Sequence, residues 1–115
     1  MNGVGTYGEF VESRGVVLDS LGLRDRALVR GDALQAIDLL EAAGIPVLGG
    51  DVYIAKQGKI ESAYANWYTD QREGETISRF AARSFAESRS YISKFPDPTD
   101  GMALFALVIG AGNDV

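Results

Sequence analysis

The sequence predicts an α+β fold: a mainly antiparallel sheet of three or four strands with a central hairpin, and helices packed on one face. Two β-rich segments, residues 47–55 and 59–68, predict the hairpin because a short glycine-containing loop separates them. Two further segments have the apolar spacing of amphipathic helices, and a near-continuous apolar run over residues 103–109 is typical of a buried strand.

The first part of the chain predicts a short helix followed by an ambiguous segment. Apolar residues at helical spacing predict the helix over residues 7–13, and Gly15 is expected to end it. In the next segment, residues 16–23, Val16-Val17-Leu18 suits a strand, whereas Asp19-Ser20-Leu21-Gly22 suits a helical turn.

A clearer helix is predicted over residues 32–43. Asp32 is suited to cap its first turn, since a carboxylate can accept hydrogen bonds from the free backbone amides there. Gly44 stands where a left-handed residue commonly ends a helix, and Pro46 prevents continuation. The apolar stripe consists of Leu34, Ala36, Ile37, Leu40 and Ala43.

The hairpin is expected to turn through a three-residue loop, Lys56-Gln57-Gly58, with Gly58 left-handed as in a type I turn with a bulge. This register pairs Ile54 with Ile60 and Tyr53 with Glu61. It predicts one face with Val52, Ile54, Ile60, Tyr64 and Tyr68, and another with Asp51, Tyr53, Glu61, Ala63, Ala65 and Trp67. A slip by one residue would reassign these faces.

The longest predicted helix spans residues 76–95, where Arg83 and Glu87 form an i,i+4 pair on the polar side. Pro96-Asp97-Pro98 is expected to end this helix before the buried strand. Because no linker divides the sequence, residues 1–115 are interpreted as one domain, whose glycine-rich ends, residues 1–5 and 110–115, are expected to be flexible.

The composition excludes several classes of function. The 115-residue chain has no cysteine and no histidine, so it lacks disulfides, thiolate chemistry and the side chain most used for proton transfer near neutral pH. Zinc or copper is not expected, a hard cation such as calcium or magnesium stays open, and no cofactor is expected.

The charge and hydropathy indicate a soluble cytoplasmic protein. The net charge of −5 argues against a nucleic-acid partner, because binding to the phosphate backbone needs a basic surface. The N-terminus shows no secretory signal. The longest apolar run, residues 102–109, is too short to span a membrane.

Four carboxylates lie nearest to the hairpin: Asp51, Glu61, Asp70 and Glu73. Two of them could act as general acid and base in a glycosidase-like site, but their spacing in the sequence does not require any two of them to lie close together. Gly49-Gly50-Asp51 lacks the lysine and the glycine spacing of a phosphate-binding loop. Two glycines before a strand predict a bend, a bulge or a close backbone approach instead.

Tyr64, Trp67 and Tyr68 form an aromatic cluster near the end of the second hairpin segment. Such a cluster is explained either by core packing or by an anchor in a protein interface. Acidic Asp70 and Glu73 follow directly, so an anchor bordered by acids would suit a basic partner.

The most distinctive strings in the chain are Leu48-Gly49-Gly50-Asp51-Val52-Tyr53 and, after it, Asn66-Trp67-Tyr68. With Gly58-Lys59-Ile60-Glu61 and the helix of residues 33–40, they resemble the immunity protein 40 family, which accompanies bacterial polymorphic toxins. The resemblance covers roughly residues 16–109. It implies a cytoplasmic antitoxin that binds a cognate toxin domain and blocks it, and it assigns no toxin-contacting residue.

The favoured hypothesis is therefore an immunity protein, not an enzyme, that occludes a cognate protein toxin domain. The predicted partner-binding surface is the hairpin face with Asp51, Tyr53, Glu61 and Trp67, extended by Asp70. Two alternatives stay open. One is a small carboxylate-dependent hydrolase or isomerase that uses Asp51 or Glu61. The other is a homo-oligomeric structural or adaptor module joined through a sheet edge or an aromatic patch.

Overall fold

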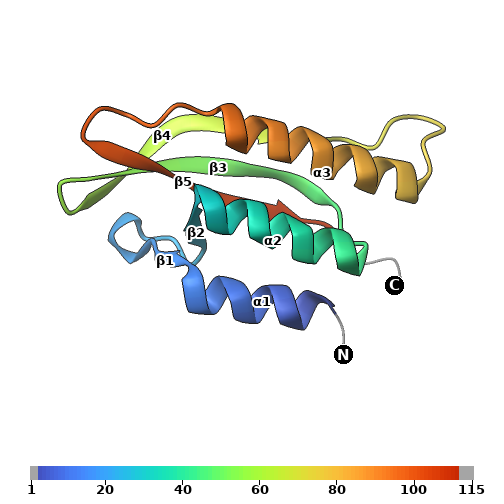
Figure 1. Ribbon diagram of the computed structural model, residues 1–115, viewed down its shortest axis with the longest axis horizontal. Coiled ribbons are helices and arrows are strands. Elements are labelled where there is room, and N and C mark those ends of the chain that lie inside the picture. The colour runs from blue at the N-terminus through green and yellow to red at the C-terminus, as the bar shows by residue number, and fades with distance from the viewer. Residues whose placement is uncertain (1–2, 112–115) are drawn as a thin grey trace.

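The computed structural model describes residues 3–111, and it confirms the α+β fold with helices on one face of an antiparallel sheet. In chain order the elements are α1 (Gly3–Arg14), β1 (Val16–Val17), the 3-10 helix η1 (Asp19–Leu21), β2 (Arg26–Val29), α2 (Arg30–Ala43), β3 (Val47–Lys56), β4 (Lys59–Tyr68), α3 (Ile77–Lys94) and β5 (Gly101–Ile109) (Figure 1). Within the described residues the five strands are ordered β1-β2-β5-β3-β4. The sheet has one strand more than the three or four predicted: β1 lies where Val16-Val17-Leu18 suits a strand, but β2, at four residues, is too short to show a clear alternation in the sequence.

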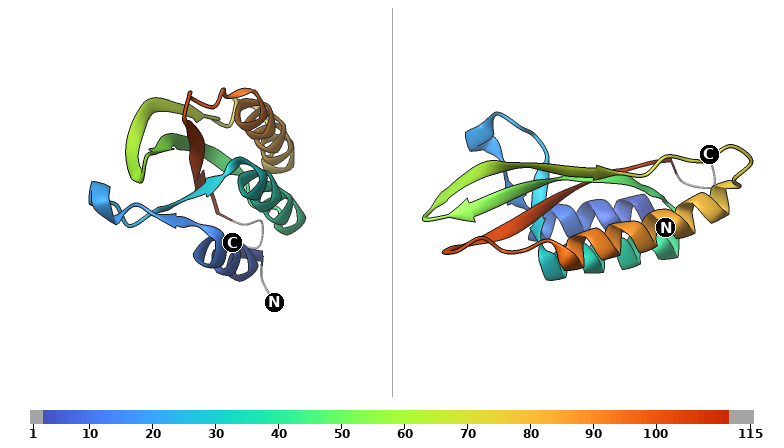
Figure 2. Two further views of the ribbon diagram at one scale, coloured as in Figure 1. Left: turned by 60° about the vertical axis from the view of Figure 1, so that its left-hand side comes forward. Right: turned by 90° about the horizontal axis from the view of Figure 1, so that it is seen from above.

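The helices and η1 lie on opposite sides of the sheet. α2 and α3 run side by side across one face, and α1 packs against α2 and β2 (Figure 1). Seen from above, η1 stands on the other side of the sheet (Figure 2, right). We call this second side the open face, because η1 is the only helical segment that covers it within residues 3–111.

Each face of the sheet has its own apolar cluster. The main core lies between the sheet and the helices, and its most buried side chains include Val52, Phe105, Ile37 and Leu40. A smaller cluster lies on the open face, where Leu18 packs with Tyr53, Leu104 and Ala106. Since Leu18 immediately precedes η1, its complete burial fastens η1 onto the open face.

The start of α2 differs from the prediction. The N-cap is Val29, which makes no side-chain hydrogen bond to the first turn, so the predicted capping role of Asp32 is wrong. Asp32 lies inside the first turn, and its Oδ1 accepts a hydrogen bond from Arg14 Nη1 at 3.4 Å. A carboxylate at this position still favours the helix through its dipole. The end of α2 matches the prediction, because Gly44 is left-handed with a φ of 70°.

The ends that were predicted to be flexible lie partly outside the described residues, since residues 1–2 and 112–115 are not described. Of the others, residues 3–5 belong to α1, and Gly110 donates its backbone N–H to the Pro46 carbonyl at 2.9 Å.

The hairpin turn is one residue shorter than predicted. Gln57 and Gly58 form it alone, with φ values of 50° and 77°. Positive φ at both residues is typical of a type I′ turn, whose twist matches that of the strands. Because residues other than glycine seldom adopt this conformation, the sequence pointed to Gly58 only. The predicted pairing of Ile54 with Ile60 is therefore wrong, and Ile54 lies opposite Glu61.

The shorter turn exchanges the predicted faces of β4 but not those of β3. Tyr53 pairs with Ser62, not with Glu61, and Val52 pairs with Ala65, so that two extra residues form a bulge in β4. An even number of extra residues leaves the alternation unchanged beyond the bulge. The helix side carries Val52, Ile54, Glu61, Ala63, Ala65 and Trp67, and the open face carries Asp51, Tyr53, Ile60, Ser62, Asn66 and Tyr68.

Two buried serines join α3 to the sheet. Ser84 and Ser88 are both 0% exposed. Ser84 Oγ accepts a hydrogen bond from the Val47 N–H at 3.0 Å and donates to the Ala81 carbonyl at 2.7 Å. Ser88 Oγ accepts from Nε1 of Trp67 at 3.0 Å. Within the described residues every buried side-chain nitrogen and oxygen has a hydrogen-bond partner, and the two serines provide some of these hydrogen bonds.

We expect Ser88→Ala to lower the free energy of unfolding by about 1–3 kcal/mol, because the buried indole N–H of Trp67 loses its acceptor. Ser90→Ala, at an exposed position of the same helix, is the matched control and should change it by less than about 0.5 kcal/mol. Urea denaturation followed by the fluorescence of Trp67 measures both. Equal effects of the two substitutions would contradict the role assigned to Ser88.

Candidate functional site

Two strings that are distant in the sequence meet on neighbouring strands. Residues 49–51 of β3 pair with residues 66–68 of β4, with Gly49 opposite Tyr68 and Asp51 opposite Asn66. These residues line a shallow, open hollow of about 330 Å³ at the end of the hairpin away from its turn. We call this area the β3–β4 patch; its lining is Leu48, Gly49, Gly50, Asp51, Asn66, Trp67, Tyr68 and Val108.

The two glycines of the patch allow close packing against β4. A Cβ on Gly50 would lie 2.4 Å from Cη2 of Trp67, so the indole ring lies directly over this glycine. A Cβ on Gly49 would lie 2.2 Å from the carbonyl oxygen of Trp67, and the φ of Gly49 is 149°. The glycines therefore serve close backbone and ring approach, as one interpretation of the sequence expected.

Trp67 itself belongs to the core and not to the exposed surface. Its side chain faces the helices, is 8% exposed and stacks on Tyr91 with 4.6 Å between the ring centroids. The indole N–H donates a hydrogen bond to Ser88 Oγ. Of the two interpretations of the aromatic cluster, core packing is correct for this residue.

The structure separates the other predicted contact residues. Asp51 is exposed on the open face, and Tyr53 lies on the same face but is only 8% exposed. Burial raises the pKa of Tyr53, and the nearby carboxylates of Asp51 and Asp25 raise it further. Glu61 is exposed on the helix side of β4, opposite Ile54, and Asp70 is exposed just beyond the end of β4.

The contact surface predicted from the sequence leaves out the side chains that are most exposed near the patch. Tyr64 is 96% exposed, Tyr68 is 76% exposed and Val108 of β5 is 48% exposed. The register predicted from a three-residue turn groups Tyr64 and Tyr68 with Val52 and Ile54, and in the structure those two residues face the main core. The alternation would have revealed the two tyrosines as exposed if the turn had been counted as two residues.

The loop between β4 and α3 is held by Arg83. Its Nε and Nη2 donate to the two carboxylate oxygens of Glu75 at 2.9 and 2.8 Å, and Nη2 also donates to the Asp70 carbonyl at 2.6 Å. Nη1 donates to Glu87 at 3.2 Å, which confirms the predicted i,i+4 pair. The hydrogen bond from Arg83, followed by one from the Arg72 N–H, lowers the pKa of Glu75 to about 2.

Asp51 and Glu61, the carboxylates on which the enzyme alternative relies, are not brought together. Asp51 is on the open face and Glu61 on the helix side, so these two side chains cannot act on opposite ends of one substrate bond. Among residues 3–111, no three aspartate, glutamate, histidine or cysteine side chains form a group that could hold a metal ion. The arrangement is that of a surface with an aromatic rim and single acidic groups.

Comparison with known families gives a match to the model of immunity protein 40 over residues 17–109. The chain belongs to this family. It is therefore an immunity protein, of a class that counters toxins and is generally non-enzymatic. No curated protein and no solved structure matches the chain.

The family match spans this immunity protein from β1 to β5. It includes the whole β3–β4 patch and both buried serines, whereas α1 precedes it. Within the described residues of the immunity protein, no helix has the length and apolarity needed to cross a membrane.

We expect Gly50→Ala to lower the free energy of unfolding by about 1–3 kcal/mol, because the new methyl group would overpack the core. It would lie 2.4 Å from the ring of Trp67 and 2.7 Å from the carbonyl oxygen of Ala106. Gly31→Ala in α2 is the matched control: its Cβ would meet no atom within 4 Å. This control should stabilise the protein by up to about 1 kcal/mol. Thermal unfolding of the two variants compares them directly, and a neutral Gly50→Ala would refute the packing argument.

The low pKa of Glu75 predicts a pH-dependent stability. A carboxylate whose pKa falls from 4.5 to about 2 on folding stabilises the protein fully above pH 4.5, and this stabilisation is lost as the pH falls toward 2. We therefore expect Glu75→Gln to be less stable than the wild type at neutral pH and to lose less stability between pH 4.5 and 2. Urea unfolding across this range measures it. Glu73→Gln, exposed in the same loop, should keep the wild-type profile; if it does not, Glu75 is not the responsible group.

Proposed function

We propose that this immunity protein binds a cognate polymorphic-toxin domain and blocks it sterically in the cytoplasm of the bacterium that makes both. Membership of the immunity protein 40 family supports the neutralisation of a toxin. The proposed mode of binding rests on one observation: residues 49–51 and 66–68 pair on neighbouring strands and line the same open hollow. Asp51 and Tyr68 are exposed at this hollow, where a partner protein can contact them.

The open face at this patch has the composition of a protein-binding surface. Tyr68 and Val108 expose apolar area beside the carboxylate of Asp51. Contiguous exposed apolar area bordered by polar groups is characteristic of interfaces, where tyrosine is enriched. The hollow is shallow and open, which suits a side chain or a loop of a partner protein better than the enclosure of a small substrate.

The five residues predicted from the sequence take different parts in this proposal. Asp51 and Asp70 are retained as direct contacts, because both are exposed at the patch and at the loop beside it. Tyr53 is buried on the open face, where it packs with Leu18 and Leu104 and gives the surface structural support instead of a direct contact. Trp67 shapes the patch by packing on Gly50. Glu61 projects from the helix side of β4 and would meet a partner only at the strand edge.

The charge distribution supports a basic partner surface. Among the described residues, the ion pairs involve Arg14, Arg30, Arg83 and Arg89. These arginines lie in the helices, so their charges are compensated on the helix side. The carboxylates of Asp51 and Asp70 belong to none of these pairs and add to a net charge of −5. Uncompensated acids of this kind accelerate the encounter with a basic surface.

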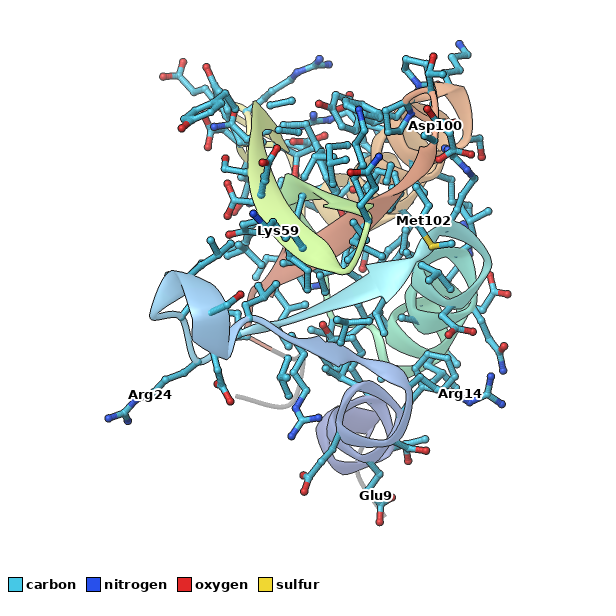
Figure 3. All side chains as sticks on the ribbon, turned by 90° about the vertical axis from the view of Figure 1, so that its left-hand side faces the viewer. Glu9, Arg14, Arg24, Lys59, Asp100 and Met102 are labelled. Atoms are coloured by element: carbon cyan, nitrogen blue, oxygen red, sulfur yellow. The ribbon has the colours of Figure 1, made fainter. Side chains whose placement is uncertain are left out.

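Co-expression with the C-terminal domain of the toxin encoded beside this protein tests the proposal. The wild type should rescue growth, and the purified proteins should form a complex measurable by calorimetry. Asp51→Lys should weaken this complex by about tenfold or more, since a reversed interfacial charge costs at least ~1.4 kcal/mol. Glu9→Lys changes the net charge equally at a position that projects from α1 away from the sheet (Figure 3), and it should bind normally.

Equal cell death with and without the wild-type protein would refute the proposed function. If Glu9→Lys weakened the complex as much as Asp51→Lys, the effect would come from net charge alone, and the open face would lose its assignment as the binding surface.

A further inference from the structure

One residue of β4 has a backbone conformation that disfavours its own side chain. Tyr64 has a φ of 55°, in the left-handed region, at the bulge where β4 shifts its register against β3. A bulky residue at positive φ is a genuine outlier, because its Cβ crowds the adjacent carbonyl oxygen. The Tyr64 N–H donates to Ser62 Oγ at 3.0 Å, so the bulge is a defined local structure.

The fold gains little from the ring of Tyr64. Its side chain is 96% exposed, the highest fraction among the exposed large hydrophobic residues of the described chain. Trp67, three residues later on the same strand, is by contrast 8% exposed and forms part of the core. Tyr64 thus combines a costly backbone conformation with almost no packing of its own.

Protection of the sheet edge explains the bulge but not the tyrosine. β4 is an edge strand, and a bulge prevents unwanted pairing with another strand. Glycine or asparagine adopts the left-handed conformation more readily and would form the same bulge. Strained residues that persist are concentrated at functional sites, and the strain here comes with an exposed aromatic ring.

The surroundings of Tyr64 indicate the kind of partner. Further along the same strand, Asn66 and the 76% exposed Tyr68 lead into the β3–β4 patch, with Asp51 opposite Asn66. The carboxylates of Asp51 and Asp70, which belong to no ion pair among the described residues, border this aromatic row. An exposed tyrosine beside acids complements an apolar socket whose rim carries lysine or arginine.

We propose that Tyr64 is the anchor residue of the toxin complex, and that its ring enters an apolar socket with a cationic rim on the toxin domain. This proposal rests on the proposed function above and assigns the central contact to a residue outside the five that the sequence predicts as partner-binding. The bulge leaves the ring exposed on the edge strand β4, and the adjoining β3–β4 patch supplies the surrounding contact area. Anchors of this kind dominate the affinity of protein interfaces and are enriched in tyrosine.

The test measures both binding and stability for Tyr64→Gly and Tyr64→Phe. Against the C-terminal domain of the adjacent toxin, Tyr64→Gly should weaken binding by about 30-fold or more, as expected of an anchor residue. Its denaturation midpoint should be unchanged or higher, because glycine adopts the left-handed conformation without strain. Tyr64→Phe keeps the ring and should bind within about threefold of the wild type. Val17→Ala, which shortens an exposed apolar residue of β1, is the control and should bind normally.

The outcomes separate this proposal from the proposed function. If Tyr64→Gly binds like the wild type while Asp51→Lys binds weakly, the anchor is refuted and the immunity function stands. If the wild type itself does not bind the toxin domain, both fail. If the wild type sediments as a dimer that Tyr64→Gly converts into a monomer with unchanged toxin binding, the socket belongs to a second copy and the proposal is overturned.

Discussion

The contact on which the rest of the structure depends is the packing of Trp67 between Gly50 and α3. The indole ring fits over Gly50 because glycine has no side chain there. Its N–H donates a hydrogen bond to Ser88, and the ring of Tyr91 stacks on its face. One side chain therefore fixes the separation of β3 and β4 and the position of α3 over both. Because aromatic rings bury a large area and the indole N–H must find an acceptor, this contact is both strong and specific. The residues that neighbour Trp67 in the sequence, Asn66 and Tyr68, are consequently turned to the open face.

A second constraint keeps the acidic loop beside the patch in one arrangement. Arg83 donates to Glu75, Glu87 and the Asp70 carbonyl, so a single guanidinium connects the loop to α3. Bidentate hydrogen bonds between arginine and a carboxylate are stronger and more directional than an exposed ion pair. The side chain of Asp70 is left out of this network and stays exposed. A loop that is ordered before binding loses less conformational entropy in a complex, which favours affinity without additional contacts.

The sequence predicted α2, α3 and the three long strands, but it predicted neither β2 nor the way in which β4 is turned. Helical spacing repeats over many residues, so α2, α3 and the long strands were recognised within a few residues of their ends. The faces of β4 depended on a single local choice, the left-handed conformation of Gln57, which is uncommon for glutamine and leaves no sequence pattern. That one choice moved Trp67 into the core and exposed Tyr68. The partner of Trp67, Ser88, lies on another element, and no spacing rule links the two residues.

Under the proposed function, the two faces of the sheet divide the work between stability and recognition. On the helix side, apolar residues are covered, buried serines are satisfied, and arginines of the helices compensate nearby carboxylates. On the open face, η1 covers only the part near Leu18 and Tyr53, and the end that carries Asp51 and Tyr68 stays uncovered. Substitutions at this end therefore change few contacts of the fold. Under the proposed function, such a division would let the exposed residues change with the toxin while the Trp67 contact keeps the sheet and its helices in place.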